Sequence, residues 1–339
     1  MNAEDRRQNS EGRIQNPKPP NSGTRTRRAN ENWISFRVQC QSESVPEPGF
    51  SVVTPSYNQG EFIEQTILSV LEQKYPALEY LILDGGSQDE TVKILQKYST
   101  DVAFWRSGKD RGQAAAINEG FRRSSGNILC WLNSDDLYLR HTLRTVANVF
   151  ADKLDEPLIV YGGCELFDDR TQAKEVRPAV AFDRTWLAVS DFLDQPSVFW
   201  TRKAWEIVGP LDESLHYGFD WEWFLRASKV CCFISVDQIL SRYRIHAGHK
   251  TGTGGKTRWL ELLKIVRIHS PPDVIQNYEY LLESSSARWW LNKRMRIEQT
   301  IRKVAPDLAA GAANVLSRPF WFLPDGISRQ MLWKISGIR

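Results

Sequence analysis

Two adjacent carboxylates follow a short apolar run in the first half of the chain. Residues 128–132 are apolar, and Asn133-Ser134-Asp135-Asp136 come directly after them. Neighbouring carboxylates repel each other unless a cation is present, and Mg²⁺ or Mn²⁺ binds oxygen ligands that it often shares with substrate phosphates. The same four residues also suit a turn with Asx capping. On these residues alone, a metal site and an ordinary turn are about equally well supported.

A third acid, Asp84, ends the apolar run at residues 80–83 and is followed by Gly85 and Gly86. An ionised carboxylate in this place can accept an N–H from the edge of a nucleotide base. Glycines allow the backbone to approach a ligand closely. The alternative is that Asp84 belongs to the capping region of a helix that begins near Asp89.

Two further acids, Asp220 and Glu222, alternate with Phe219, Trp221 and Trp223. Aromatic neighbours partly desolvate a carboxylate, which raises its proton affinity and suits a general base. Surface acids at the start of a helix, where they favour the helix dipole, are the simpler interpretation of this segment taken alone.

Alternating strands and helices are predicted to position these acids. The predicted strands are 50–54, 78–83, 102–105, 128–132 and 158–161, and the predicted helices are 61–73, 89–98, 113–123 (ended by Gly126) and 143–150. Such alternation predicts an α/β fold with a mostly parallel central sheet and helices on both faces. Ligands bind beyond the carboxyl ends of the strands in such sheets, and that is where Asp84 and Asp135 stand.

The alternation weakens after residue 162. Helices near 203–208 and 221–228, a closing strand near 239–245, and helical patterns at 256–268 and 287–305 are predicted. The expected organisation is a disordered basic arm at 1–46, one catalytic domain at 47–255, and a helical extension at 256–339. Basic residues and apolar positions in 287–305 predict a helix that lies on an anionic membrane, or else one that packs on the domain.

Charge and composition exclude several classes of protein. The net charge is +3, with basic ends and an acidic middle, whereas a nucleic-acid reader carries its basic surface on the folded body. The 13 Trp residues suit sugar-binding grooves as well as an ordinary core. Five cysteines without C-x-x-C spacing, no secretory segment and no run of 18 apolar residues predict a cytoplasmic protein.

Two nucleotide-binding classes lack their motifs. A dehydrogenase needs G-x-G-x-x-G after the first strand, where this chain has PSYNQG at 55–60. A P-loop has the motif G-x-x-x-x-G-K-[ST]. Residues 250–257 end like this motif but begin with Lys250 where the motif has Gly. That Gly-rich stretch is expected to be either a loop that closes over a bound diphosphate or a plain linker.

Several segments in chain order resemble the family-two inverting glycosyltransferases with the GT-A fold. They are SVVTPSYN at 51–58, ILDGGSQDET at 82–91, DRGQ at 110–113 with AINEG at 116–120, WLNSDD at 131–136, QPSVF at 195–199 and FDWE at 219–222. The resemblance covers about residues 50–250, and the order of the motifs makes it specific.

The resemblance implies roles for individual residues. Asp84 would accept the N3–H of the base, Asp220 would be the general base, and Glu222 is the reserve candidate for that role. The nucleotide-sugar donor would meet Thr54, Pro55, Tyr57, Asn58, Glu61, Asp84, Asp110, Gly112, Gln113, Asn133 and Ser134. The metal, Mn²⁺ or Mg²⁺, would be held by Asp135, the last acid of a D-x-D segment, with Asp136 and His246. Asn133 replaces the first acid of D-x-D, and Gly85 stands where many relatives have a second acid.

The function expected from this resemblance is transfer of a sugar, with inversion, from a nucleotide-sugar to an acceptor hydroxyl. A UDP-sugar is favoured because cytosine has no N3 proton to donate to Asp84. The acceptor would be a saccharide or a lipid-linked molecule in polysaccharide or glycolipid assembly, used in the cytoplasm or at the inner face of the plasma membrane. The alternative is a non-catalytic scaffold that binds a sugar nucleotide or a membrane.

Overall fold

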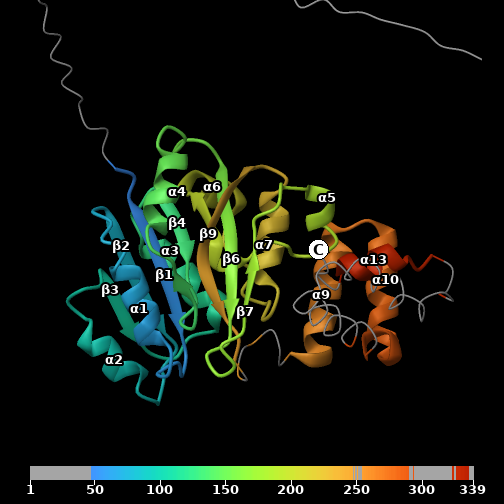
Figure 1. Cartoon of the computed structure of the whole chain (residues 1–339), viewed down its shortest axis with the longest axis horizontal. Coiled ribbons are helices and arrows are strands. Elements are labelled where there is room, and N and C mark those ends of the chain that lie inside the picture. Colours follow the sequence, from blue (N-terminus) through green and yellow to red (C-terminus); the bar gives the residue numbers. More distant parts are fainter. Residues whose placement is uncertain are drawn as a thin grey trace, which may run out of the picture. The chain divides into compact units, whose positions relative to one another are not determined.

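Four parallel strands form the first part of a mixed sheet (Figure 1). In the computed structural model, the central strand β1 (Phe50–Ser56) pairs with β2 (Leu78–Asp84) and β4 (Ile128–Trp131), and β2 pairs with β3 (Phe104–Ser107). β1 and β4 are buried along their whole length, as expected for strands that are covered on both faces. These strands confirm the predicted parallel sheet.

The second part of the sheet is mixed. β8 (Val198–Thr201) lies antiparallel between β4 and β6 (Leu158–Phe167), and β9 (Cys232–Arg244) runs parallel to β6. Two shorter antiparallel strands complete the sheet, β5 (Leu137–Tyr138) on β9 and β7 (Lys174–Arg177) on β6. Among the described residues, the strand order is β3-β2-β1-β4-β8-β6-β9-β5, with β7 beside β6.

β6 is longer than the predicted strand at 158–161 because it continues through Gly162 and Gly163. The pairing with β9 shifts register at these glycines. A Cβ atom on Gly162 would lie 2.5 Å from the Leu240 side chain, so only glycine allows the two strands to approach there.

Helices cover both faces of the sheet, as predicted. The helices of one face are α1 (Ile63–Leu71), α2 (Thr91–Lys97) and α4 (Thr142–Phe150), and those of the other are α3 (Gln113–Arg123), α6 (Arg202–Val208) and α7 (Phe219–Ala227). Successive side chains of β1 point to opposite faces, so Val52 packs in one hydrophobic cluster and Val53 in the other.

The bounds predicted for α3, residues 113–123, are confirmed, but Ser124 and not Gly126 is its C-cap. Gly126 instead allows a close approach to β1, because a Cβ atom there would lie 2.6 Å from Ser51 Oγ. Two short elements that were not predicted, α5 (Arg184–Leu187) and the 3₁₀ turn η1 (Gln195–Ser197), lead into β8.

Among the described residues, the helices α9 (Gly255–His269), α10 (Pro272–Glu283) and α13 (Arg329–Ile335) follow the sheet. α9 matches the helical pattern expected at 256–268. The buried side chains of Val266, Tyr278 and Leu332 belong to the same hydrophobic cluster as α3 and α7. These helices therefore share their core with the sheet.

The structure describes residues 47–246, 248, 250, 254–289, 293, 323 and 326–335. They lie in one unit, Pro46–Arg339. The predicted arm at 1–46 and most of the predicted helix at 287–305 lie outside the described residues. In the described part of the chain, no helix is long and apolar enough to cross a membrane.

Candidate active site

The carboxyl ends of β1, β2 and β3 are aligned. Ser56 pairs with Asp84, and Asp84 pairs with Ser107, so the loops that follow the three strands leave the sheet at one edge. The loop after β4, residues 133–136, leaves at the same edge because β4 is parallel to β1. The loops after β1, β2 and β4, which carry many of the residues predicted for the site, are thus brought to one edge of the sheet.

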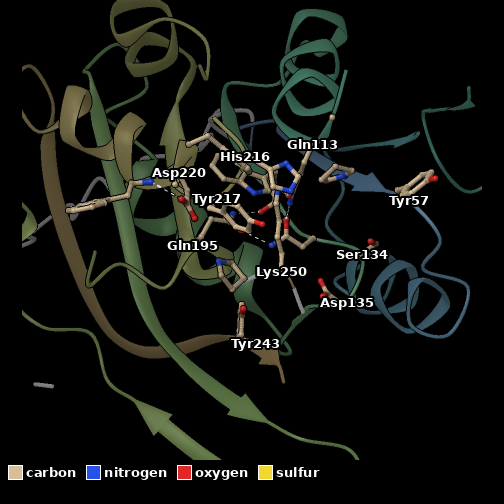
Figure 2. A pocket seen from close by; sticks show the side chains of 18 of the residues that line it. Tyr57, Gln113, Ser134, Asp135, Gln195, His216, Tyr217, Asp220, Tyr243 and Lys250 are labelled. Carbon is tan, nitrogen blue, oxygen red and sulfur yellow. Dashed lines mark hydrogen bonds between the residues drawn. The ribbon is translucent and has the colours of Figure 1, made fainter. Parts of the chain in front are cut away.

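A cleft of about 1120 Å³ lies at this edge and extends to the C-terminal helices. Figure 2 labels ten of its lining residues, among them Tyr57 and Asp135 from loops after strands and Asp220 from the start of α7. Seven of the predicted donor-binding residues line the cleft, namely Pro55, Tyr57, Asp110, Gly112, Gln113, Asn133 and Ser134.

The other predicted donor-binding residues do not line the cleft. Thr54 is buried and shares a hydrogen bond of 3.0 Å with the Tyr80 hydroxyl. Asn58, with φ of 51°, accepts the Gln88 N–H through its side chain, and Glu61 is exposed. Thr54 therefore links β1 to β2, and Asn58 links the two loops that follow these strands.

Asp84 lies directly under the cleft wall that Gly85 and Gly86 form. Its carboxylate is buried and accepts hydrogen bonds from the amides of Gly86 and Ser87 at 3.1 and 2.9 Å. The hydroxyls of Ser87 and Ser107 donate to it at 2.5 and 2.6 Å. Asp84 Oδ2 takes three of the four bonds and Oδ1 only one, so a lone pair on Oδ1 is left for a further donor.

The loop after β4 separates its two acids. Asp135 lines the cleft, whereas the side chain of Asp136 is buried and accepts hydrogen bonds from the Arg244 amide and Asn133 Nδ2 at 3.1 and 3.2 Å. Burial and the neighbouring charge of Asp135 raise the pKa of Asp136 well above its usual range. From α1, Thr66 Oγ1 donates to the carbonyls of Ser134 and Asp136, both at 2.9 Å.

Asp135 and His246 form a pair that suits a divalent cation. Asp135 Oδ2 lies 3.0 Å from His246 Nε2, so both can point to one site. Within the described residues, no group of three or more His, Cys, Asp or Glu side chains is placed to hold a metal ion. The donor set therefore fits a cation that takes two protein ligands and completes its shell with diphosphate and water.

Arg244 connects β9 to the Asp135–Asp136 loop. Its Nε donates to the Asp135 carbonyl at 2.9 Å, and it pairs with Asp169. The guanidinium lies 4.9 Å from the Phe62 ring and 4.6 Å from the Phe167 ring. Because the side chain is only 1% exposed, it holds the loop from inside the protein.

Asp220 and Glu222 have different surroundings. Asp220, in the first turn of α7, lines the cleft, and its burial raises the pKa of the carboxyl despite the charges of Lys250 and Arg258. Glu222 is not part of the cleft lining and accepts hydrogen bonds from Arg226 Nε at 2.9 and 3.0 Å. Burial opposes its ionisation, but hydrogen bonds from His269 and Arg226 leave the pKa of Glu222 lowered.

The start of α7 is held by a carboxylate from α9. Glu261 accepts the backbone N–H groups of His216, Tyr217 and Gly218 at 2.8, 2.5 and 2.8 Å. An anion is favourable at this place because it satisfies free amides at the positive end of the helix. Glu261 thus fixes the turn that carries Asp220.

Lys250 is a cleft residue to which the sequence assigned no role. Its ammonium donates to Gln113 Oε1 at 2.9 Å (Figure 2), and Gln113 Nε2 donates to Asn133 Oδ1 at 2.8 Å. Burial lowers the pKa of Lys250 to about 8, although Asp220 and Glu261 oppose the shift. The sequence could not predict this contact, because a lysine in a Gly-rich stretch carries no pattern that points to Gln113.

The strand order, and the cleft at the strand ends, are those of an α/β protein with the GT-A fold. Two solved structures share this fold with a TM-score of 0.52. One is Staphylococcus aureus TarS 1–349 in complex with UDP-GlcNAc, 17% identical, with 72% of this chain and 75% of that one covered. The other is the mannosyltransferase PcManGT from Pyrobaculum calidifontis in complex with GDP-Man and Mn²⁺, 19% identical, with 86% of each chain covered.

Sequence comparison gives the family. Residues 51–201 match the family model of glycosyl transferase family 2. An uncharacterized glycosyltransferase of Rickettsia prowazekii is 28% identical over 224 residues, which cover 62% of this chain and 68% of that protein. The putative teichuronic acid biosynthesis glycosyltransferase TuaG of Bacillus subtilis is 37% identical over 102 residues, 29% of this chain and 40% of that protein. The family-two resemblance inferred from the sequence is therefore confirmed over residues 51–201.

Proposed function

We propose that this glycosyltransferase moves a sugar from a UDP-sugar to an acceptor hydroxyl with inversion at the anomeric carbon. The observation that carries the proposal is that Asp220 and Asp135 line one cleft while lying on separate elements. A base and a diphosphate site on opposite sides of a reacting carbon are what a single displacement needs.

Asp220 is the base in this proposal. The acceptor oxygen bonds to the anomeric carbon as the bond from that carbon to the diphosphate oxygen breaks, and the acceptor proton passes to the Asp220 carboxylate. The raised pKa of Asp220 makes its carboxylate a stronger base than an exposed one. Glu222 is less suited because Arg226 already holds its carboxylate outside the cleft.

Asp135 and His246 would hold Mn²⁺ or Mg²⁺. When bound, such a cation supplies positive charge for the leaving diphosphate. Asp136 supports the loop in this proposal instead of binding the cation, since its oxygens face Asn133 and the Arg244 amide. Lys250 adds a second positive charge next to Asn133, the residue that replaces an acid in the D-x-D segment.

Asp84 directs the choice of donor. In this proposal the lone pair left on its Oδ1 accepts the N3–H of uracil, and Gly85 allows Tyr57 and Asp110 to approach the loop closely. The two structural neighbours carry different nucleotides, UDP and GDP, and therefore do not choose between donors.

Assembly of a cell-envelope polysaccharide or a glycolipid is the process we propose. TuaG, named for teichuronic acid biosynthesis, supports a polysaccharide. A lipid-linked acceptor would place the enzyme at the cytoplasmic face of a membrane, where the basic residues of 287–305 could meet anionic lipids. Sedimentation of the full chain with anionic vesicles, compared with a variant whose Arg294, Arg296, Arg302 and Lys303 are changed to Gln, tests this contact.

Release of UDP by the purified protein tests the activity. We expect UDP from a UDP-hexose in the presence of Mn²⁺, with slow transfer to water when no acceptor is added, and a glycoside of inverted configuration by NMR once an acceptor is found. A folded protein that binds UDP but releases none from any UDP-sugar would be the scaffold of the alternative hypothesis. Binding of CMP-sugars alone would contradict the role of Asp84.

A further inference from the structure

We infer that the end of the cleft next to the C-terminal helices binds a neutral sugar ring of the acceptor. This acceptor pocket consists of Ser190 and Asp191 from the segment after α5, Arg258 of α9, Tyr278 of α10 and Ile335 of α13. All but Ser190 and Asp191 lie outside residues 51–201, the part that matches the family model. The inference rests on the proposed function, because it takes Asp220 as the base.

The place of the pocket relative to Asp220 indicates its occupant. The donor-side residues come from loops after β1, β2 and β4, whereas α9 and α10 lie on the other side of α7 (Figure 1). Arg258 is close enough to Asp220 for its charge to favour the ionised carboxylate. An acceptor whose hydroxyl reaches Asp220 must therefore place the rest of its ring between Asp220 and these helices.

The walls of the pocket are fixed before any ligand binds. Trp221 Nε1 donates to the Leu187 carbonyl at 2.8 Å, and the Tyr278 hydroxyl donates to the Val189 carbonyl at 2.9 Å. The rings of Trp221 and Tyr278 are stacked with centroids 6.3 Å apart. Because α7 and α10 both hold the segment before Asp191, the pocket needs little ordering on binding.

The chemistry of the walls suits a polyhydroxylated, uncharged ring. Asp191 Oδ1 accepts the Leu193 N–H at 3.1 Å, which fixes its carboxylate. Asp194, nearby in the same cleft, pairs with Arg177 at 3.4 Å. Two carboxylates and two guanidiniums balance in charge, so they offer acceptors and donors to hydroxyls without favouring an anion.

Saturation-transfer NMR tests the pocket without knowledge of the natural acceptor. The probes are methyl glycosides of glucose, galactose, mannose and N-acetylglucosamine, with methyl glucuronide as the charged counterpart, each with and without UDP. We expect the wild-type chain to bind at least one neutral glycoside, and Asp191→Asn to weaken that binding about tenfold because a charge-assisted hydrogen bond is lost. Arg258→Gln is expected to weaken it as well.

Glu279→Gln is the matched control, since Glu279 lies on α10 and pairs with Arg267 at 2.6 Å. It should change neither glycoside nor UDP binding, and Asp191→Asn should leave UDP affinity within about twofold. Equal glycoside binding by Asp191→Asn, Arg258→Gln and wild type would overturn the inference, as would tighter binding of the glucuronide or UDP binding without any glycoside binding. Glycoside binding that depends on Asp191 in a chain that does not bind UDP would leave the pocket standing and reject the proposed donor instead.

Discussion

At the scale of residues, two acids that are only two positions apart have opposite tasks. Asp220 and Glu222 lie about 200° apart around α7, so they face different surroundings. Asp220 faces the cleft with a raised pKa, and Glu222 is tied to Arg226 and His269 with a lowered pKa. The first arrangement favours proton transfer, and the second favours stability.

Exchange of each carboxylate for its amide separates the two tasks. We expect Asp220→Asn to lower kcat by roughly 10²–10⁴ with UDP affinity unchanged. Glu222→Gln should keep most of the activity and lose about 1–3 kcal/mol of unfolding free energy. Steady-state kinetics and denaturant unfolding measure both effects, and the reverse pattern would exchange the roles.

The two pKa shifts also predict opposite pH effects. Because the pKa of Asp220 is raised, wild-type kcat should fall as pH falls through a value above the ordinary aspartate range. Because the folded pKa of Glu222 is lowered, its stabilising contribution is present above the unfolded value of about 4.5 and is lost as pH falls through the folded pKa. Unfolding of Glu222→Gln should therefore depend less on pH in this acidic range than that of the wild type.

Lys250 predicts a pH dependence of donor binding. Its pKa of about 8 means that the ammonium loses its proton as pH rises through about 8. UDP affinity should therefore fall above that pH, and Lys250→Met should weaken binding about tenfold at pH 7 and remove the pH dependence. Titration calorimetry across pH 6–9 measures it, with Lys264→Met on the exposed face of α9 as the control. An unchanged profile in Lys250→Met would remove Lys250 from the donor site.

At the scale of elements, the loop after β4 depends on β9, more than 100 residues further along the chain. The buried Arg244 bonds the Asp135 carbonyl and Gln65 Oε1, and its own amide bonds Asp136. A guanidinium can serve such divergent partners because its donors form a rigid fork, which a lysine lacks.

Arg244→Lys is therefore expected to weaken Mn²⁺-dependent UDP binding, and Arg244→Met to cost roughly 1–3 kcal/mol by removing the hydrogen bonds to the Asp135 carbonyl and Gln65. Unfolding in denaturant and the Mn²⁺ dependence of UDP binding measure the two effects. Arg242→Met is the matched control from the same strand, since Arg242 forms a partly exposed pair with Glu165 at 2.7 Å and should cost less than about 1 kcal/mol. Equal losses of unfolding free energy in Arg242→Met and Arg244→Met would contradict the proposal that Arg244 holds the loop after β4.

At the scale of the whole described unit, the sheet and the C-terminal helices share one core. Val266, Tyr278 and Leu281 belong to the hydrophobic cluster that contains Val53 and Trp131. Glu261 of α9 also holds the turn before Asp220. The helices are therefore part of the same folded unit as the sheet, whether or not the segment between α10 and α13 meets a membrane.

A chain that ends before α9 should consequently fail to give a cooperative unfolding transition. Removal of the C-terminal helices would expose the apolar side chains of α7 that now pack on α9 and α10. Each large buried side chain contributes about 1.5–3 kcal/mol to the free energy of unfolding. Calorimetry of the full chain should show the sheet and the helices unfolding in one transition. A truncated chain with the same melting temperature as the full chain would contradict the shared core.

The sequence by itself determined the features that depend on local pattern. Apolar runs followed by polar loops marked β1, β2 and β4, and the stripe Ile63, Ile67 and Val70 marked α1. Parallel strands end at one edge, so the loops at 55–58, 84–87 and 133–136 could be assigned to one site. The family resemblance then added the expected roles of Asp84, Asp135 and Asp220.

Only the tertiary structure decided what depends on contacts between distant segments. The antiparallel insertion of β8 between β4 and β6 joins segments about 70 and 40 residues apart, and short strands carry no pattern that names their partners. Distant contacts also separate the two adjacent acids. The Arg244 amide donates a hydrogen bond to Asp136, whereas His246 lies beside Asp135. Lys250 reaches Gln113 across 137 positions because chain folding, and not sequence spacing, sets which charges share a low-dielectric cleft.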